Sequence, residues 1–181
     1  QESILIPVNL SNVATVVRNA SSLEMTGLEL EVMYQVSEAW DVMATYGYLN
    51  SEYDNYVADL TGDGIVTDNS DLVPRNTPEN TFGLTTSYTT QIGDGDLKAR
   101  ISYRFRDSME TESQNNPLGS LDSIHNVNAN INYTISNYMV SVWGRNITDE
   151  REERWSTIGG LTSRGWWNEP ATYGVTFSAS F

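Results

Sequence analysis

Apolar and polar residues alternate one by one through seven segments of this chain, each about ten residues long. In the clearest segment, apolar residues from Leu97 to Phe105 alternate with Lys, Arg and Ser residues. A period of two is the period of a β-strand that has one apolar and one polar face. The chain is therefore predicted to be all-β, with strands at about residues 27–36, 40–49, 82–88, 97–106, 126–135, 138–145 and 172–181. Residues 2–8 are a candidate for a clipped eighth strand, and residues 149–155 are expected to be loop or at most one turn of helix.

The connections between these segments are short and long in strict alternation. Residues 37–39, 92–96 and 136–137 are expected to be tight turns, whereas residues 54–78, 107–122 and 148–170 form long loops. All long loops then lie at one end of the sheet, as in outer-membrane barrels with short periplasmic turns and long extracellular loops. The strands of a soluble β-sandwich also alternate. The loop asymmetry and the aromatic residues near strand ends favour an antiparallel transmembrane β-barrel.

The composition narrows the classes of partner and site. There are 24 acidic and 10 basic residues, and this charge of -14 argues against a nucleic-acid partner, because phosphate binding needs clustered Lys and Arg. The absence of cysteine excludes disulfides, thiolate metal sites and a cysteine nucleophile. The mean hydropathy is -0.41, and no apolar run approaches the roughly 18 residues of a membrane helix. A low mean hydropathy is compatible with a transmembrane β-barrel, because the apolar residues of its strands alternate with polar ones.

Several stretches match a known family in its order along the chain. They are Asn19-Ala20 with Gly27–Glu31, Pro74–Pro78, Val140–Glu150 and Asn168–Gly174. Together they resemble the C-terminal part of the barrel of TonB-dependent outer-membrane receptors. Ala171 stands where the family usually has arginine. The ending Tyr173–Phe181, with its terminal Phe, resembles the signal by which outer-membrane barrels are recognised for insertion, so that Tyr173, Val175, Phe177 and Phe181 are expected to carry this signal.

The resemblance implies a fold larger than this chain. Receptors of this kind are plugged barrels of 22 strands, and about eight strands are expected here. Residues 1–181 are thus interpreted as the C-terminal portion of the barrel domain, without the plug. An alternative is a small standalone eight-stranded outer-membrane barrel with an adhesive or structural role. A polypeptide with several hundred residues before Gln1 would favour the receptor.

The resemblance also implies a function and a location. It predicts a non-enzymatic transporter of the bacterial outer membrane that imports a scarce nutrient with energy supplied through TonB. The nutrient could be a ferric siderophore, cobalamin, an oligosaccharide or a similar solute. The implied partners are the outer-membrane lipid, the rest of the barrel with its plug, the TonB complex and the barrel-assembly machinery.

Four basic residues share one face of a predicted strand, namely Lys98, Arg100, Arg104 and Arg106. This face is the lumenal face if the chain is a barrel, because the other face would meet lipid. The basic ladder could line a path for an anionic solute or pair with acidic residues of the plug. We favour a simpler interpretation, in which Glu29, Glu31 and Asp41 on other strands neutralise it as wall packing.

The last long loop is the candidate region for ligand contact. Tryptophan faces stack on sugars or cations, and arginine binds anionic chelates. The loop combines both residue types, at Arg151, Arg154, Trp155, Arg164, Trp166 and Trp167. His125, the single histidine, is expected to be a lumenal or loop-edge residue. No partner spacing around it suggests a catalytic triad, so no enzyme activity and no catalytic residue is predicted.

The first long loop contains a candidate calcium site. Residues 59–71 approach the pattern D-x-[DN]-x-[DN]-G, in which oxygens at positions 1, 3 and 5 surround the cation and glycine makes the turn. The candidate ligands are Asp59, Thr61, Asp63, Ile65 (through its carbonyl), Thr67 and Asp71. Thr61 replaces a carboxylate or amide, and Asp71 falls one position late. The alternative is a solvated acidic loop with Asp-Gly turns. No cofactor is required by this interpretation.

Overall fold

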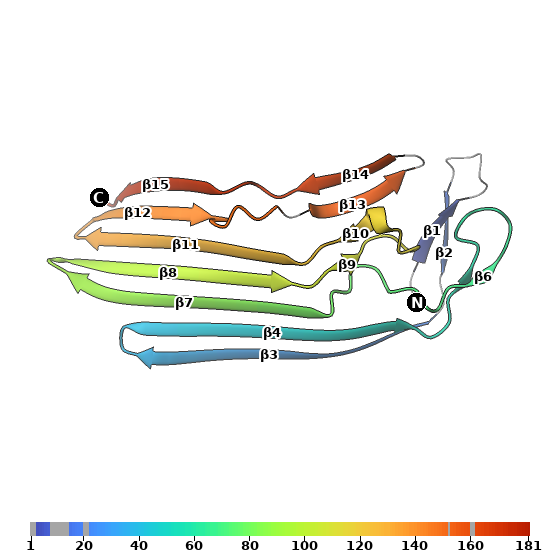
Figure 1. Ribbon diagram of the computed structural model, residues 1–181. Coiled ribbons are helices and arrows are strands. Elements are labelled where there is room, and N and C mark those ends of the chain that lie inside the picture. The colour runs from blue at the N-terminus through green and yellow to red at the C-terminus, as the bar shows by residue number, and fades with distance from the viewer. Residues whose placement is uncertain (1–2, 8–14, 20–21, 152, 160–161) are drawn as a thin grey trace.

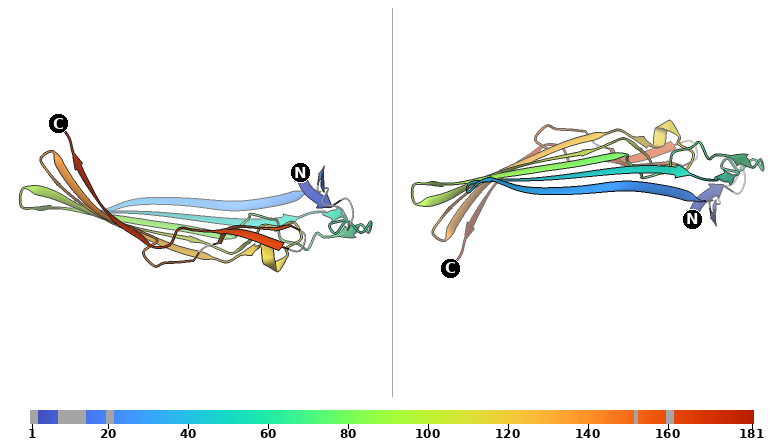
Figure 2. Two further views of the ribbon diagram at one scale, coloured as in Figure 1. Left: turned by 90° about the horizontal axis from the view of Figure 1, so that it is seen from above. Right: turned by 90° about the horizontal axis from the view of Figure 1, so that it is seen from below.

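A seven-stranded antiparallel sheet forms most of the computed structural model, which describes residues 3–7, 15–19, 22–151, 153–159 and 162–181. All seven predicted strands are confirmed, and each pairs with its neighbours in the order β15-β12-β11-β8-β7-β4-β3 (Figure 1). They are β3 (Leu23–Ser37), β4 (Trp40–Tyr53), β7 (Asn80–Ile92), β8 (Gly95–Arg106), β11 (Ile124–Ile135), β12 (Tyr138–Arg145) and β15 (Thr172–Ala179). Seen edge-on, the sheet twists from one edge to the other (Figure 2).

The candidate eighth strand needs a correction. Residues Ser3–Pro7 do form a strand, β1, but it pairs with β2 (Thr15–Asn19) in a separate two-stranded sheet. The alternation in residues 2–8 indicates an extended segment, but it carries no information about which segment pairs with it. The described strands of the main sheet therefore number seven rather than about eight.

The predicted turns and loops lie at opposite ends of the sheet, as Figure 1 shows. The three tight turns follow β3, β7 and β11, and Gly93 and Ser136 adopt positive φ there. The long connections contain short elements of their own. These are β5 (Val57–Ala58), β6 (Thr67–Asp68), β9 (Met109–Glu110), η1 (Pro117–Gly119), β10 (Ser120–Leu121), β13 (Glu153–Gly159) and β14 (Thr162–Trp167). In the described part of the chain, no helix is both long and apolar enough to span a membrane.

The stretch at residues 149–155 also departs from its prediction. Strand β13 begins at Glu153 and pairs with β14, so the last long connection carries a β-hairpin where loop or a helical turn was expected. Trp155, Thr157 and Ile158 are aromatic or β-branched, and such residues favour extended backbone when a partner strand is available.

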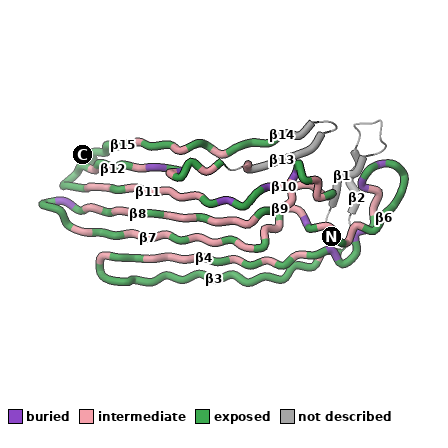
Figure 3. The backbone as a smooth tube through the Cα atoms, viewed as in Figure 1, coloured by how far each residue is buried: buried purple, intermediate pink, exposed green. Residues whose placement is uncertain are grey.

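The register lines up the apolar residues of all strands on one face of the sheet. One such row runs through Leu30, Tyr46, Phe82 and Phe105, which are paired in turn across β3, β4, β7 and β8. These side chains are exposed or half-buried rather than packed in a core. Leu30 is 55% exposed, and Val175 on β15 is 70% exposed. Figure 3 shows the same pattern along the strands. An apolar face of this extent needs an apolar surrounding, as the outer side of a membrane barrel has.

The buried hydrophobic cluster lies where β4 runs into the first long loop. Tyr53, Tyr56 and Leu60 are buried together, and the rings of Tyr53 and Tyr56 have their centroids 4.5 Å apart. The second long loop is fastened to the first. The Asn115 side chain accepts from the Val73 amide over 2.6 Å and donates to the Val73 carbonyl over 2.9 Å. The first two long loops therefore form one packed unit.

Candidate ligand-binding site at the long-loop end of the sheet

The basic ladder lies where the alternation predicts it. Lys98, Arg100, Arg104 and Arg106 occupy alternate positions on the polar face of β8. The polar face of β11 continues this surface, because Lys98, Arg100 and Arg104 pair with three of its asparagines, Asn132, Asn130 and Asn126. Asn128 donates to Asn126 over 2.9 Å. In a barrel this polar face is the lumenal face.

A further arginine, Arg145 at the end of β12, joins this surface. Its guanidinium carbon lies 5.3 Å from the ring centre of Trp143, which stands on the same face and donates from Nε1 to the Thr176 hydroxyl over 3.1 Å. A cation over an indole ring is attracted by the negative face of the ring. Arg145 was missing from the predicted ladder, although its alternation with Val142 and Gly144 signals the same face.

A hollow of about 1040 Å³ gathers part of these residues at the long-loop end of β8. Arg104 and Arg106 line it from β8, Arg145 lines it from β12, and Trp167 lines it from the last long connection. This volume matches that of small-molecule sites, which measure roughly 300–1,000 Å³. The hollow unites members of two predicted groups, the basic ladder and the third loop. Lys98 does not line it, and Arg100 lines a second hollow of about 420 Å³ beside Trp143 and Arg145.

Asn146 fixes the last long connection to the sheet beside this hollow. The residue is 5% exposed, and its amide nitrogen donates to Asn128 Oδ1 over 2.9 Å. Its side chain donates to the carbonyls of Glu150 and Glu169 and accepts from the Glu150 amide, over 3.0–3.1 Å. These bonds join the beginning and the end of the connection that carries β13 and β14. The sequence shows Asn146 only as part of the family-like stretch at 140–150.

The structure places some of the third-loop candidates, and ligand contact by them stays a prediction. Trp166 and Trp167 are 71% and 59% exposed, and Trp167 lines the hollow. Arg151 is exposed as well. The backbone of Arg154, Trp155 and Arg164 belongs to β13 and β14, but their side chains lie outside the described residues.

The loop at residues 59–71 is closed by its own hydrogen bonds. The carboxylate of Asp59 accepts from the amides of Gly62 and Gly64 over 2.7 and 2.8 Å and from the Thr61 hydroxyl over 3.3 Å. Burial raises the pKa of Asp59, but the hydrogen bonds from Gly64, Gly62, Thr61 and Asp63 outweigh it and hold the pKa below its usual 3.8. Within the described residues, no three His, Asp or Glu side chains gather as metal ligands would. Calcium binding by this loop stays a prediction.

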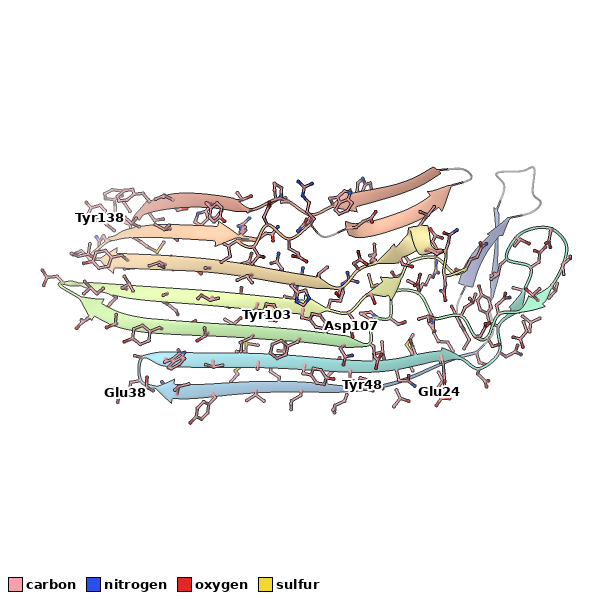
Figure 4. The ribbon with its side chains drawn as sticks, in the orientation of Figure 1. Glu24, Glu38, Tyr48, Tyr103, Asp107 and Tyr138 are labelled. Carbon is pink, nitrogen blue, oxygen red and sulfur yellow. The ribbon has the colours of Figure 1, made fainter. Side chains whose placement is uncertain are left out.

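His125 lies at the loop edge, which is one of its two expected places, and not on the lumenal face. The residue lies on the apolar face of β11, paired with Phe105, and its Nδ1 atom is 2.8 Å from the hydroxyl of Tyr103 (Tyr103 is labelled in Figure 4). Its position two residues before Val127 gives it the parity of the apolar face. The centroids of the His125 and Phe105 rings are 5.0 Å apart. His125 thus belongs to an aromatic group near the long loops.

The C-terminal residues of the expected insertion signal lie on the outer face of an edge strand. Tyr173, Val175 and Phe177 are paired with Gly144, Val142 and Val140 of β12 and are each at least 65% exposed. Phe181 follows the strand and is also exposed. This placement fits the expected signal, and its recognition by the assembly machinery stays a prediction.

Comparisons with known proteins address the fold and the family. A family model described as "TonB dependent receptor-like, beta-barrel" matches residues 3–147. The ferric yersiniabactin uptake receptor FyuA from Yersinia pestis is similar to the chain with a TM-score of 0.76 and 16% identity, over 92% of this chain and 25% of that receptor. The siderophore receptor PiuA from Acinetobacter baumannii gives a TM-score of 0.69 and 20% identity, over 96% of this chain and 23% of that receptor.

A third solved structure agrees with these two. The ferric-catecholate import receptor Fiu from Escherichia coli K12 gives a TM-score of 0.64 and 20% identity, over 99% of this chain and 24% of that receptor. The chain thus spans about a quarter of the length of the receptors it matches. The TM-scores show a shared fold, and the family match covers most of the chain. The chain belongs to the TonB-dependent receptor-like β-barrel family, whose members are outer-membrane transport proteins rather than enzymes.

Proposed function

We propose that the polypeptide containing this chain is an outer-membrane receptor that imports a ferric siderophore with energy supplied through TonB. The observation that carries the proposal is the meeting of Arg104, Arg106 and Arg145 with Trp167 around one hollow at the long-loop end of the sheet. Guanidinium groups bind the oxygen-rich anionic surface of a chelate, and an indole face packs against its rings. The names of the similar receptors, which refer to ferric or siderophore uptake, support this choice.

The other nutrients predicted from the family resemblance fit this hollow less well. Cobalamin and neutral oligosaccharides do not require three arginines, although an oligosaccharide would also stack on Trp167. The plug, the TonB complex and the assembly machinery remain proposed partners of the whole receptor. The alternative of a standalone eight-stranded barrel is less favoured, because the outer strands of the described sheet, β3 and β15, are not paired with each other.

Binding measurements on the purified full-length receptor test the proposal. We expect quenching of tryptophan fluorescence by an anionic ferric tris-catecholate chelate, and an affinity about three- to tenfold lower after R104Q or R145Q, as for loss of one charged contact. The matched control is K98Q, because Lys98 belongs to the same ladder but lines neither hollow. Binding of cobalamin or a maltooligosaccharide without binding of any ferric chelate would contradict the proposal.

A further inference from the structure

The polar face is divided into an acidic side and a basic side that lie in the same rows. Glu31 on β3 pairs with Thr45 on β4, Thr45 pairs with Gly83 on β7, and Gly83 pairs with Arg104 on β8. The next row toward the long loops repeats the order, because Glu29 is connected in the same way through Gly47 and Thr81 to Arg106. Each glutamate thus faces an arginine three strands away, at roughly 14 Å by the usual strand spacing.

The residues between the two charged sides are small and uncharged. Gly83 and Gly47 lie beside the hydroxyls of Thr45 and Thr81, and a Cβ atom at either glycine would come within 2.6–2.7 Å of those hydroxyl oxygens. The threonine side chains therefore occupy the space above the glycines, and no longer side chain rises there. The result is a shallow trough across β4 and β7, with hydroxyl groups on its floor. Thr45, Thr81 and Gly83 also line the 1040 Å³ hollow.

We propose that this trough, together with the arginines beside it, selects a dipolar ligand, whose cationic group faces Glu29 and Glu31 and whose anionic part faces Arg104, Arg106 and Arg145. The inference rests on the proposed function and narrows its substrate class to a ferric chelate that carries an ammonium group beside its anionic metal-binding part. Complementary charges on opposite sides of a site fix the orientation of a ligand and discriminate against ligands of one charge sign.

The position of the trough favours a ligand over a segment of the plug as its occupant. The two rows are the last two of β8 before the long loop that begins at Asp107 (Figure 4). The hollow is also bordered by residues 167–170 of the last long connection. The trough therefore opens toward the loops that a solute from outside meets first.

Two probes that differ in one charge test the inference on the full-length receptor. They are a synthetic ferric tris-catecholate and the same chelate with one appended primary amine, each titrated by tryptophan fluorescence. We expect the amine-bearing chelate to bind about three- to fivefold more tightly, the range of one partly exposed charge pair. In the E29Q/E31Q variant this preference should disappear, whereas R104Q should weaken both chelates. The preference should also shrink at 1 M salt.

The matched control is E24Q. Glu24 lies on the same strand, β3, but on its other face, so its removal should leave the preference unchanged. Equal affinities for the two chelates in the wild type, or an equal loss for both in E29Q/E31Q, would overturn the inference and leave the proposed function intact. A change in thermal stability without a change in preference would assign the glutamates to a plug contact and also overturn it. Failure of both chelates to bind would overturn the proposed function, and this inference with it.

Discussion

The backbone amide of Asn146 donates a hydrogen bond to the side chain of Asn128 over 2.9 Å, and so ties the end of β12 to the polar face of β11. The Asn146 side chain holds both ends of the connection that carries β13 and β14. Replacement by alanine would leave the carbonyls of Glu150 and Glu169 without this partner, at a cost of about 2 kcal/mol. We expect N146A to raise hydrogen exchange in β13 and β14 while β8 and β11 keep their protection.

The control for this experiment is N130A, which changes an asparagine of the same polar face away from the connection. Unchanged exchange in β13 and β14 of N146A would show that other contacts hold the hairpin. A uniform increase over the whole sheet would instead indicate a general loss of stability.

The contact between Asn115 and Val73 predicts how the first two long loops move together. Asn115 has a φ of 47°, a conformation that glycine adopts without steric strain. N115G therefore removes the two side-chain hydrogen bonds to Val73, together with a longer one to the Glu112 carbonyl, and leaves the backbone relaxed. Two such bonds contribute about 1–2 kcal/mol. We expect faster exchange of the Val73 amide and earlier proteolysis in both loops. N116G changes the next residue, whose side chain bonds locally to Leu118, and should leave the Val73 amide protected.

The lowered pKa of Asp59 predicts a pH dependence of the first loop. A depressed pKa means that the folded loop favours the carboxylate form. The stabilisation is thus complete above the usual pKa of 3.8 and is lost as the pH falls through the lowered value. We expect the amides of Gly62 and Gly64 to lose protection only in this acidic range. The D59A variant should lack the transition, and a transition near neutral pH would contradict the assignment.

The predicted calcium site in the same loop needs its own measurement. Asp59 and Asp63 supply carboxylates at positions 1 and 5 of the expected ligand set, and a bound cation would compete with the amide hydrogen bonds of Asp59. Calorimetric titration of the full-length receptor should show a heat of calcium binding that disappears in D63N. A titration without heat would remove the site.

The opposite faces of β12 should respond differently to the same charge. Val142 lies on the apolar face between Ile131 and Val175, and Ser141 lies on the polar face between Asn132 and Thr176. An arginine on the lipid side of a barrel costs about 2–4 kcal/mol near the bilayer centre. V142R should therefore lower the free energy of unfolding from lipid vesicles by this amount, with S141R as the control. Equal effects would contradict the assignment of the faces.

The strands could be predicted because alternation is a local property. From Leu97 to Arg106, the apolar or polar character of each residue indicates the face of the strand on which it lies, and the structure agrees with that assignment. Arg145 on the polar face of β12 and His125 on the apolar face of β11 follow the same alternation rule. A strict use of the rule would therefore have assigned both residues to their faces. The partner of the Ser3–Pro7 strand could not be predicted in this way. Alternation shows that a segment is extended, but it does not show which other segment pairs with it.

The organisation of the long loops could not be predicted for a related reason. The bond from Gln114 to the Leu60 carbonyl joins residues that are 54 positions apart, and the Asn115 contact with Val73 spans 42. Neither pair has a repeating pattern. The hollow likewise depends on the β13–β14 hairpin, which brings Trp167 back to Arg145. From the sequence, this hairpin was expected only as a loop rich in Trp and Arg.

A substitution at Gly174 should affect ligand binding in the hollow, although Gly174 does not line it. A Cβ atom there would lie 2.3 Å from the Trp143 ring, which is rigid and cannot yield without moving as a whole. Overpacking of this kind costs about 1–3 kcal/mol, and a displaced Trp143 would no longer support Arg145. We expect G174A to weaken binding of the ferric tris-catecholate and to destabilise the sheet.

A double-mutant cycle isolates the cause of this effect. With W143A as the background, the added methyl group has space, so G174A should then cost almost nothing in stability or affinity. Such coupling would identify the collision with Trp143 as the origin of both losses. Additive effects of the two substitutions would instead mean that Gly174 acts through the backbone of β15, where it pairs with Trp143 across the edge of the sheet.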